Sequence, residues 1–122
     1  MTADDDRWRR GAEVFSDVTG LPAPNRGDDY VADVVIDQVF AEIWTRPGLT
    51  RKERRWISIT CASMTGATFA METHFGAALR TGDISIDELR EFIIHFAAYA
   101  GHPRATAARA ALDAAWSQVA DA

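Results

Sequence analysis

The sequence predicts an all-α protein, and three observations support this fold class. Apolar residues recur every three or four positions along most of the chain, glycine and proline mark the breaks, and no segment alternates between apolar and polar residues as a half-buried strand does. The 122 residues, 48% of them hydrophobic, suffice for one modest core. We therefore expect a single domain of six helices over residues 1–122, with residues 1–6 as a disordered tail.

The first two helices are predicted over residues 7–18 and 28–43, with a break rich in proline and glycine at residues 20–25. The β-branched run in the second segment also fits a strand. We favour a helix because the run is too long for a typical strand and no turn residue interrupts it. Asp28 and Asp29 also suit the positive end of a helix. Apolar residues cover much of the circumference of this helix, which indicates burial on more than one side.

Four further helices complete the predicted fold, and turn and capping signals set their limits. Thr50 with Glu53, and Ser85 with Glu88, have the spacing of a capping box, in which a hydroxyl and a carboxylate satisfy free amide groups at a helix start. A glycine follows the third, fourth and fifth helices and favours their termination. The four helices cover about residues 50–64, 68–80, 85–100 and 104–119.

Charge and hydropathy exclude several classes of function. The net charge is −5, and Glu53 interrupts the basic tract at residues 51–55, so nucleic acid is not an expected partner. No apolar run approaches the roughly 18 residues of a membrane span, so a membrane is not expected either. The N-terminus lacks the apolar stretch of a secretory signal, and a cytoplasmic location follows by default.

The cysteine and histidine content argues against a disulfide or a metal site. Cys61 is the single cysteine, which excludes an intrachain disulfide, a Cys-x-x-Cys pair and a thiolate zinc site. Its apolar neighbours predict a buried side chain, although a nucleophilic role stays open. His74, His95 and His102 lack the i, i+4 pairing of a helical metal site, so no metal is expected. His102 lies between a glycine and a proline and is expected to cap the end of the fifth helix.

Two of the predicted helices, residues 28–43 and 85–100, are apolar on more than one face. Six short helices cannot bury that much apolar surface within one subunit, and exposed apolar patches of this size usually mark an interface. We therefore expect a homo-oligomer with a pocket near the contact between subunits.

One block of the sequence, Glu-Ile-Trp-Thr-Arg-Pro-Gly-Leu at residues 42–49, resembles a motif of the carboxymuconolactone decarboxylase family, which shares its fold with the alkylhydroperoxidase D proteins. The resemblance covers nearly the whole chain and implies an all-helical subunit, commonly assembled as a homotrimer or homohexamer. It extends to Arg7, Gly11, Arg54 and residues 74–82, 86–91 and 98–105.

The family divides into two chemistries, and the sequence distinguishes them. The hydroperoxidase branch uses a Cys-x-x-Cys pair, and this chain has Ala67 and Ala70 at those positions, so a thiol relay is excluded. The decarboxylase branch implies loss of carbon dioxide from a small carboxylated lactone such as 4-carboxymuconolactone, without a metal or an organic cofactor. Such a reaction needs an apolar wall around the departing carboxylate, a hydrogen-bond donor or cation near the lactone oxygen, a general acid for carbon and a cation for any second carboxylate.

His74 is the best candidate for the general acid. Histidine titrates near neutrality, and small residues on the same helix face would leave room for a ligand. A core histidine bonded to a backbone carbonyl is the competing interpretation. His95 is either a second proton carrier or a structural residue, and Tyr99, one turn later, is a candidate wall of the substrate site. Glu42 either orients His74 or pairs with Arg46.

Arg46 is the candidate for binding a substrate carboxylate. A guanidinium matches a carboxylate with two parallel hydrogen bonds, and the turn at residues 47–48 would hold it in place. Its alternative role is to cap the carbonyls of the preceding helix. Arg54 is a second candidate cation, although an ion pair is favoured for it, and Trp44 either lines the ligand site or packs against the protein.

The sequence therefore predicts a cofactor-independent lyase that acts on a small carboxylic acid or lactone. Another acid/base enzyme on the same scaffold, such as an isomerase, and a non-catalytic oligomer that binds a small acid remain alternatives. Thr106 stands where decarboxylases of the family often have asparagine, so the exact lactone stays open.

Overall fold

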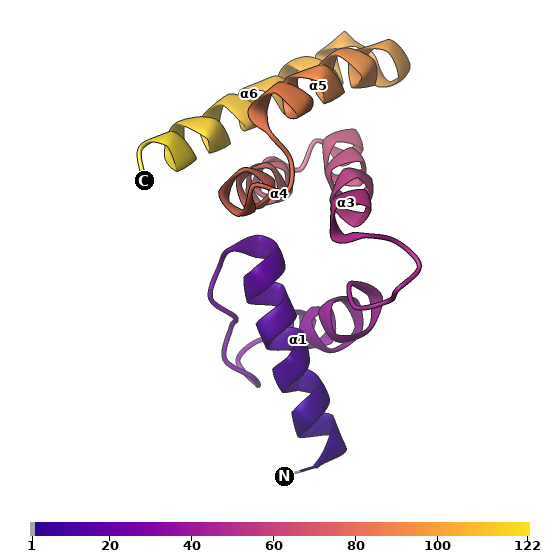
Figure 1. Cartoon of the computed structure of the whole chain (residues 1–122), viewed down its shortest axis with the longest axis vertical. Coiled ribbons are helices and arrows are strands. Elements are labelled where there is room, and N and C mark those ends of the chain that lie inside the picture. The colour runs from indigo at the N-terminus through magenta and orange to yellow at the C-terminus, as the bar shows by residue number, and fades with distance from the viewer. Residues whose placement is uncertain (1) are drawn as a thin grey trace. The chain divides into compact units, whose positions relative to one another are not determined.

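The computed structural model describes residues 2–122, and every regular element in this range is helical, which confirms the predicted fold class. The chain divides between Thr50 and Arg51 into two compact units. The first unit contains α1 (Ala3–Thr19), α2 (Tyr30–Val34) and the π-helix η1 (Val35–Ile43), and the second contains α3 (Arg51–Thr65), α4 (Thr68–Thr81), α5 (Ile86–Ala100) and α6 (His102–Ala120) (Figure 1).

Helix α1 begins earlier than the sequence predicts. A disordered tail is predicted over residues 1–6, but residues 3–6 form the first turn of α1, and Met1 lies outside the described residues. A capping box stabilises this start, because Asp5 N donates to Thr2 Oγ1 and Thr2 N donates to Asp5 Oδ2, both at 3.1 Å. The acidic side chains of the first turn also suit the positive end of the helix. Local capping therefore accounts for the additional turn.

The second predicted helix is present, but most of it is a π-helix. After the short helix α2, the backbone hydrogen bonds of η1 reach back five residues, as in the 3.0 Å bond from Trp44 N to Val39 O. Asp29 caps the start of α2 by accepting from Val31 N at 2.9 Å. The apolar periodicity predicts the helix but not its hydrogen-bond register, because 9 residues are too few for a slightly wider turn to change the pattern.

A glycine allows α1 and η1 to approach each other closely. A Cβ atom built on Gly11 would lie 2.2 Å from Ile36 O and 3.1 Å from the Cβ of Ala41. The two helices pack directly against each other, with Phe15 edge-on to the buried ring of Phe40 at a centroid distance of 5.0 Å. Gly11 therefore sets the spacing between these helices.

Replacing Gly11 by alanine should destabilise the protein by about 1–3 kcal/mol, although alanine inside a helix normally favours folding by about 1 kcal/mol over glycine. The new methyl group would overlap the backbone oxygen of Ile36, which cannot rotate away. Urea unfolding followed by circular dichroism measures the change. Gly76→Ala is the matched control, because its Cβ would meet the flexible end of the Arg80 side chain, 2.8 Å from Nη1. Equal effects of the two substitutions would contradict the close contact at Gly11.

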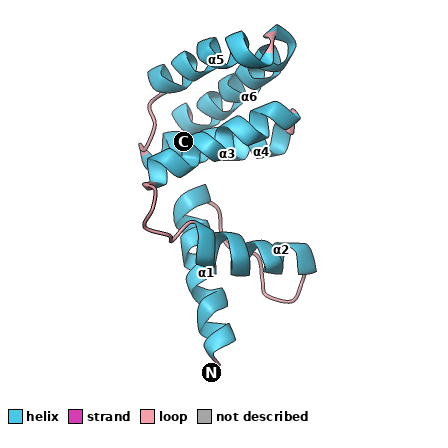
Figure 2. Ribbon diagram, turned by 90° about the vertical axis from the view of Figure 1, so that its right-hand side faces the viewer, coloured by secondary structure: helices cyan, strands magenta, loops and turns pink. Residues whose placement is uncertain are grey.

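The second unit packs four helices around one apolar core. Figures 1 and 2 show α5 and α6 side by side and antiparallel, and α4 packs against both α3 and α6. The buried face of α6 is made of alanines and one leucine, which lets α4 lie close to it. The larger core residues are Ile59, Met71, Phe75, Ile84, Leu89, Phe96 and Leu112.

The limits of α5 follow the capping signals of the sequence. Glu88 N donates to Ser85 Oγ and Ser85 N donates to Glu88 Oε1, each at 3.1 Å, which confirms the predicted capping box. Gly101, with φ of 96°, ends α5 and directly precedes α6. His102 is therefore the first residue of α6 and not a cap at the end of α5, because the two helices are joined without a longer loop.

Cys61 is exposed, which corrects the prediction of a buried thiol. The core face of α3 carries Ile59 and Ala62, and Cys61 lies outside that face. Two apolar residues of the same helix are also exposed, Ile57 at 53% and Met64 at 45%. The prediction fails because α3 carries apolar residues on both its buried and its exposed faces.

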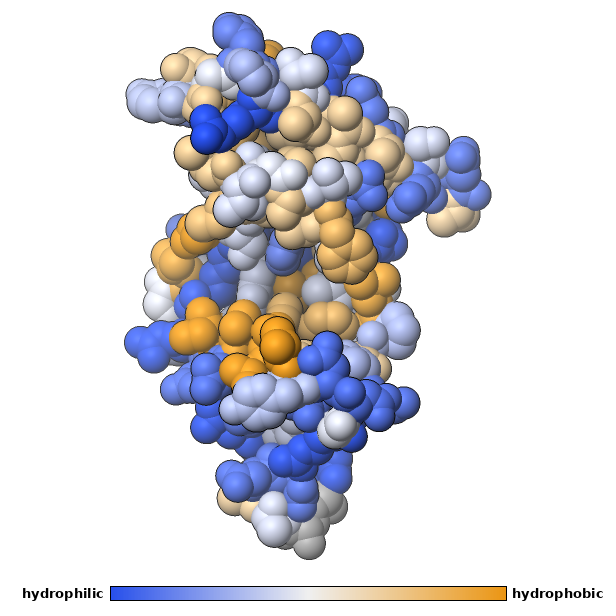
Figure 3. Space-filling view, turned by 180° about the vertical axis from the view of Figure 1, so that it is seen from behind, coloured by the Kyte–Doolittle hydropathy of each residue, from blue (hydrophilic) through white to orange (hydrophobic). Residues whose placement is uncertain are grey.

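The first unit also exposes apolar side chains. Val31, Val39 and Ile43 are exposed, and Figure 3 shows apolar side chains gathered over the part of the surface formed by α2 and η1. Patches of this kind are sites where protein surfaces associate. Among the helices of residues 2–122, none is both long enough and apolar enough to cross a membrane.

Candidate functional site

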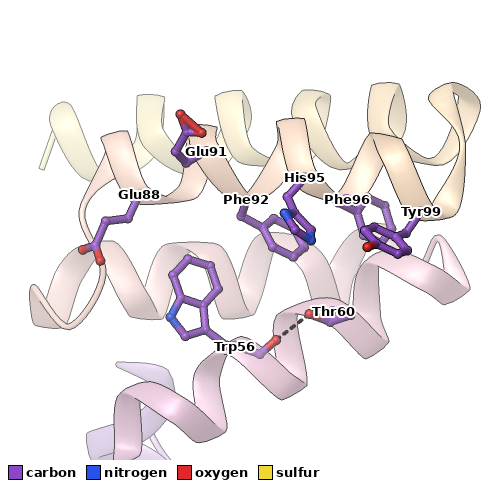
Figure 4. Close-up of a pocket in the computed structure, with 8 residues that line it drawn as sticks. All are labelled: Trp56, Thr60, Glu88, Glu91, Phe92, His95, Phe96 and Tyr99. Carbon is purple, nitrogen blue, oxygen red and sulfur yellow. Dashed lines mark hydrogen bonds between the residues drawn. The ribbon is translucent and has the colours of Figure 1, made fainter.

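A groove of about 720 Å³ lies between α3 and α5 in the second unit (Figure 4). Helix α3 contributes Trp56 and Thr60, and the Thr60 hydroxyl donates to Trp56 O at 2.7 Å. Helix α5 contributes the remaining wall through side chains spaced one helical turn apart. These residues are Glu88, Glu91, Phe92, His95, Phe96 and Tyr99.

Aromatic rings form most of the groove wall. The ring of Phe92 stacks on Trp56 with centroids 5.8 Å apart and on Phe96 at 5.3 Å. The rings of His95 and Tyr99 stack at 5.2 Å with an angle of 15° between their planes, and both side chains are exposed. The structure thus brings together the two candidates that the sequence places on α5. Their flat faces suit a planar ring as a stacking partner.

The carboxylates at the groove rim are held in place or directed away from the rings. Glu88 Oε2 accepts from Lys52 Nζ at 2.7 Å, and Oε1 accepts from Ser85 N. The hydrogen bond from Lys52, followed by that from the Ser85 backbone, holds the pKa of Glu88 below its usual value. The carboxylate of Glu91 extends away from the rings (Figure 4). None of the described residues that line the groove is Lys or Arg, so its walls do not supply a cation for an anionic ligand.

His74 lies on α4, outside the lining of this groove, and its side chain is half-buried. The next residue, Phe75, is a core residue whose ring meets Phe92 of the groove wall at a centroid distance of 6.3 Å. Nδ1 of His74 is buried and has no hydrogen-bond partner among residues 2–122. Burial, and then the positive charge of Arg55, lower the pKa of His74 from its ordinary value of 6.5. The lowered pKa favours the neutral imidazole, and its Nδ1 is a buried nitrogen that is not satisfied by a hydrogen bond within residues 2–122.

Arg55 is the cation that acts on His74, whereas the sequence points to its neighbour Arg54. Arg55 is 1% exposed, and its Nε donates to Asp83 Oδ2 at 2.8 Å. It lies four residues before the buried Ile59, so it occupies the core face of α3. A basic residue at an apolar position of the helical pattern is the signal that could have identified it. Arg54 is half-buried on the same helix.

The candidate residues of the first unit lie at and beyond the end of η1. Glu42 Oε2 accepts from Arg7 Nη2 at 2.9 Å, and Arg7 is a partner that the sequence analysis did not propose for Glu42. Trp44 stacks on Phe40 with centroids 6.0 Å apart and an angle of 5° between the rings. Arg46 is exposed, and its backbone N donates to Ile43 O at 3.2 Å. Within residues 2–122, no three or more His, Cys, Asp or Glu side chains are grouped where they could hold a metal ion.

The lowered pKa of His74 predicts a pH-dependent stability that His74→Gln removes. Between pH 6.5 and the lower pKa of the folded state, the unfolded chain binds a proton at this residue and the folded chain does not. The free energy of unfolding therefore falls as the pH falls through this window, and it has no such slope above pH 6.5. Urea unfolding of both proteins at about pH 7.5 and about pH 5.5 measures the effect. The stability of the wild-type protein relative to the variant should decrease at the lower pH, and an unchanged difference would contradict the assignment.

The family model of the carboxymuconolactone decarboxylase family matches residues 31–114, which is more than half of the chain. The chain belongs to the carboxymuconolactone decarboxylase family. This confirms the resemblance seen in the sequence. The match begins in α2 and includes η1, α3, α4 and α5, so both His74 and the aromatic groove lie within the family region.

Two decarboxylases are similar to this family member. A 4-carboxymuconolactone decarboxylase from Acinetobacter baylyi is 32% identical over 112 residues, which cover 86% of this chain and 83% of that protein. The nitrosuccinic acid decarboxylase npaB from Metarhizium robertsii is 28% identical over 71 residues, which cover 58% of this chain and 49% of that protein. Family membership and these two relatives support a decarboxylase-family role for the chain.

Proposed function

We propose that this protein is a cofactor-independent lyase that removes carbon dioxide from a small carboxylated lactone such as 4-carboxymuconolactone. The chain is similar to a 4-carboxymuconolactone decarboxylase, and one observation on His74 supports the proposal. The imidazole is half-buried, its Nδ1 has no hydrogen-bond partner within residues 2–122, and the positive charge of the buried Arg55 contributes to its lowered pKa. Such an arrangement suits a reaction in which one proton moves and negative charge passes through a poorly solvated site.

The proposed reaction needs no redox step. The bond between the ring carbon and its carboxylate breaks, carbon dioxide leaves, and the electron pair spreads through the ring double bond to the lactone oxygen. A cation near that oxygen lowers the energy of the resulting anion. The imidazolium of His74 then gives its proton to carbon, the electron pair returns from oxygen, and the lactone carbonyl is restored. Each turnover therefore consumes one proton from solvent.

Substrate binding is expected to favour protonation of His74 before the step in which its proton is transferred to carbon. In the free protein the pKa of His74 is lowered, so the ring is mostly neutral near pH 7. A bound carboxylate beside the ring would favour the imidazolium, because an opposite charge stabilises the protonated form. Binding of the anionic substrate therefore favours the protonated form of His74. When the carboxylate leaves as neutral carbon dioxide, this stabilisation is lost, and the imidazolium becomes a stronger acid.

The remaining candidates keep the roles that their chemistry suggests. Arg46 is assigned the role of binding a second carboxylate of the substrate, and Arg54 is the alternative cation for this role. Trp44 is assigned as an apolar wall of the ligand site. His95 is assigned as a second proton carrier with Tyr99 as its stacking partner in the groove. We also assign to the protein a cytoplasmic location and, from the family resemblance, an assembly of three or six copies. The exposed apolar side chains on both units support association between copies but not their number.

The decisive experiment incubates the purified protein with 4-carboxymuconolactone and follows ultraviolet loss of the conjugated lactone together with release of carbon dioxide. The Acinetobacter baylyi enzyme serves as a positive control for the substrate preparation. We expect both signals to appear at a rate proportional to protein concentration, and a chelator should leave this rate unchanged. Consumption by the control enzyme alone would reject this substrate.

A second candidate substrate class is the nitro acids, which the similarity to a nitrosuccinic acid decarboxylase favours. Loss of carbon dioxide beside a nitro group leaves an electron pair that the nitro group accepts, so the same proton donor would serve. Nitrosuccinate incubated under the same conditions should then release carbon dioxide. If neither acid is consumed but either binds, as measured by calorimetry, the protein is better described as a non-catalytic oligomer that binds small acids.

A further inference from the structure

Helix α1 contacts two consecutive carbonyl oxygens of η1. The backbone of Gly11 lies so close to Ile36 O that a Cβ atom there would come within 2.2 Å of this oxygen. One turn earlier on α1, Arg7 donates its Nε to Asp37 O at 3.2 Å. The π-helix is thus contacted at its backbone and not through its side chains alone.

The guanidinium of Arg7 also bridges two carboxylates of η1. Its Nε lies 3.3 Å from Asp37 Oδ1, and its Nη2 lies 2.9 Å from Glu42 Oε2. These two acids are five residues apart. In an α-helix five residues advance by about 500°, so the side chains would point about 140° apart. In a π-helix, where hydrogen bonds join residues five apart, such residues lie about one turn apart on the same side.

We infer that Arg7 is a positioning residue that holds residues 35–43 in the π register and thereby sets the orientation of the segment that follows. One guanidinium reaches both carboxylates when they share a side of the helix, which the α register does not provide. The three side chains are 39%, 42% and 57% exposed, so each ion pair is individually weak. Arg7 therefore selects between two helical registers more than it stabilises the fold.

The register matters because it continues to the edge of the proposed substrate-binding segment. Trp44 N bonds to Val39 O, five residues back, and its ring lies parallel to that of Phe40. In the α register Trp44 N would instead bond to Phe40 O, and the indole and the residues after it would turn to a different direction. Arg46 follows two residues later. The inference rests on the proposed function in this last step, where Arg46 binds a substrate carboxylate.

The test compares Arg7→Leu with Arg10→Leu. Both substitutions remove one arginine from α1, but Arg10 is exposed and has no ion pair or hydrogen bond within residues 2–122. Crystal structures of the two variants show the register directly. We expect Arg7→Leu to replace the bond from Trp44 N to Val39 O by one to Phe40 O, and Arg10→Leu to keep the original bond. An Arg7→Leu structure that keeps the π register overturns the inference.

Kinetics separate this inference from the proposed function. With 4-carboxymuconolactone, Arg7→Leu should raise KM about tenfold with kcat nearly unchanged, because a misdirected Arg46 loses binding that is equal in the ground and transition states. Arg7→Lys, which keeps the charge but cannot bridge both acids, should behave like Arg7→Leu. A shifted register with unchanged KM refutes the link to Arg46. If the wild-type protein does not turn over the lactone, the crystal structures still decide the role of Arg7.

Should Arg7→Leu not fold, Glu42→Gln removes one of the two ion pairs of Arg7, and its crystal structure tests the register in the same way.

Discussion

Replacing His74 by alanine should lower the rate of decarboxylation of 4-carboxymuconolactone by about 100-fold or more, because the proposed reaction loses its general acid. The expected loss falls mainly on kcat, since the imidazole gives its proton in the transition state and contributes less to binding of the ground state. The pH profile supplies a second signature. For the wild-type protein, kcat/KM should decrease as the pH rises through the pKa of His74, which lies below 6.5 in the free protein. The variant should lose this limb of the profile.

Two other histidines serve as controls for this substitution. His102→Ala removes an exposed imidazole at the start of α6 and should leave the rate within about twofold of wild type. His95→Ala removes the ring that stacks on Tyr99 in the groove and tests the second proton carrier. A normal rate for His74→Ala together with a large loss for His95→Ala would move the chemistry from α4 to the aromatic groove.

Replacing Asp83 by asparagine should destabilise the protein by about 3 kcal/mol, because it leaves the charge of Arg55 buried without its carboxylate partner. The 2.8 Å pair joins α3 to the turn after α4, and Arg55 is 1% exposed, so water cannot replace the lost carboxylate fully. Asp83 itself is 30% exposed, which places the expected effect at the lower end of the range for buried pairs. Urea unfolding at pH 7 gives the difference in the free energy of unfolding.

Asp87→Asn is the matched control for this measurement. Asp87 pairs with Arg90 at 3.7 Å and is 91% exposed, so its replacement should change stability by less than about 0.5 kcal/mol. The double variant Arg55→Met/Asp83→Asn should recover part of the loss, since it removes the buried charge together with its partner. Equal stability of Asp83→Asn and Asp87→Asn would show that the buried pair does not hold the second unit together.

The helical architecture could be predicted because it is encoded in short-range features. Apolar spacing locates each helix, and the hydroxyl of Ser85 three residues before Glu88 specifies the start of α5 by itself. The family assignment could be made for a similar reason, since its motifs are contiguous in sequence. The same logic missed the helical start at Thr2, where the capping box with Asp5 follows the same rule.

The features that escaped prediction depend on contacts between distant residues. The π register of η1 involves Arg7, about 30 residues earlier, and no local pattern reports such a contact. Exposure of Cys61 depends on which apolar face of α3 the other helices cover. Arg55 was missed because a charged residue is normally assigned to the surface, and its partner Asp83 lies 28 residues away.

The lone thiol of Cys61 provides a ready attachment point for a spectroscopic probe. The chain has 1 cysteine, and that cysteine sits on the outer surface of α3 beside Trp56, Ile57 and Thr60, two of which also line the aromatic groove. A nitroxide or fluorophore can therefore be attached to the native chain at one defined position without any mutation. Dipolar spectroscopy would then test whether copies associate as proposed and, if they do, how many, and changes in label mobility would report whether a ligand enters the groove.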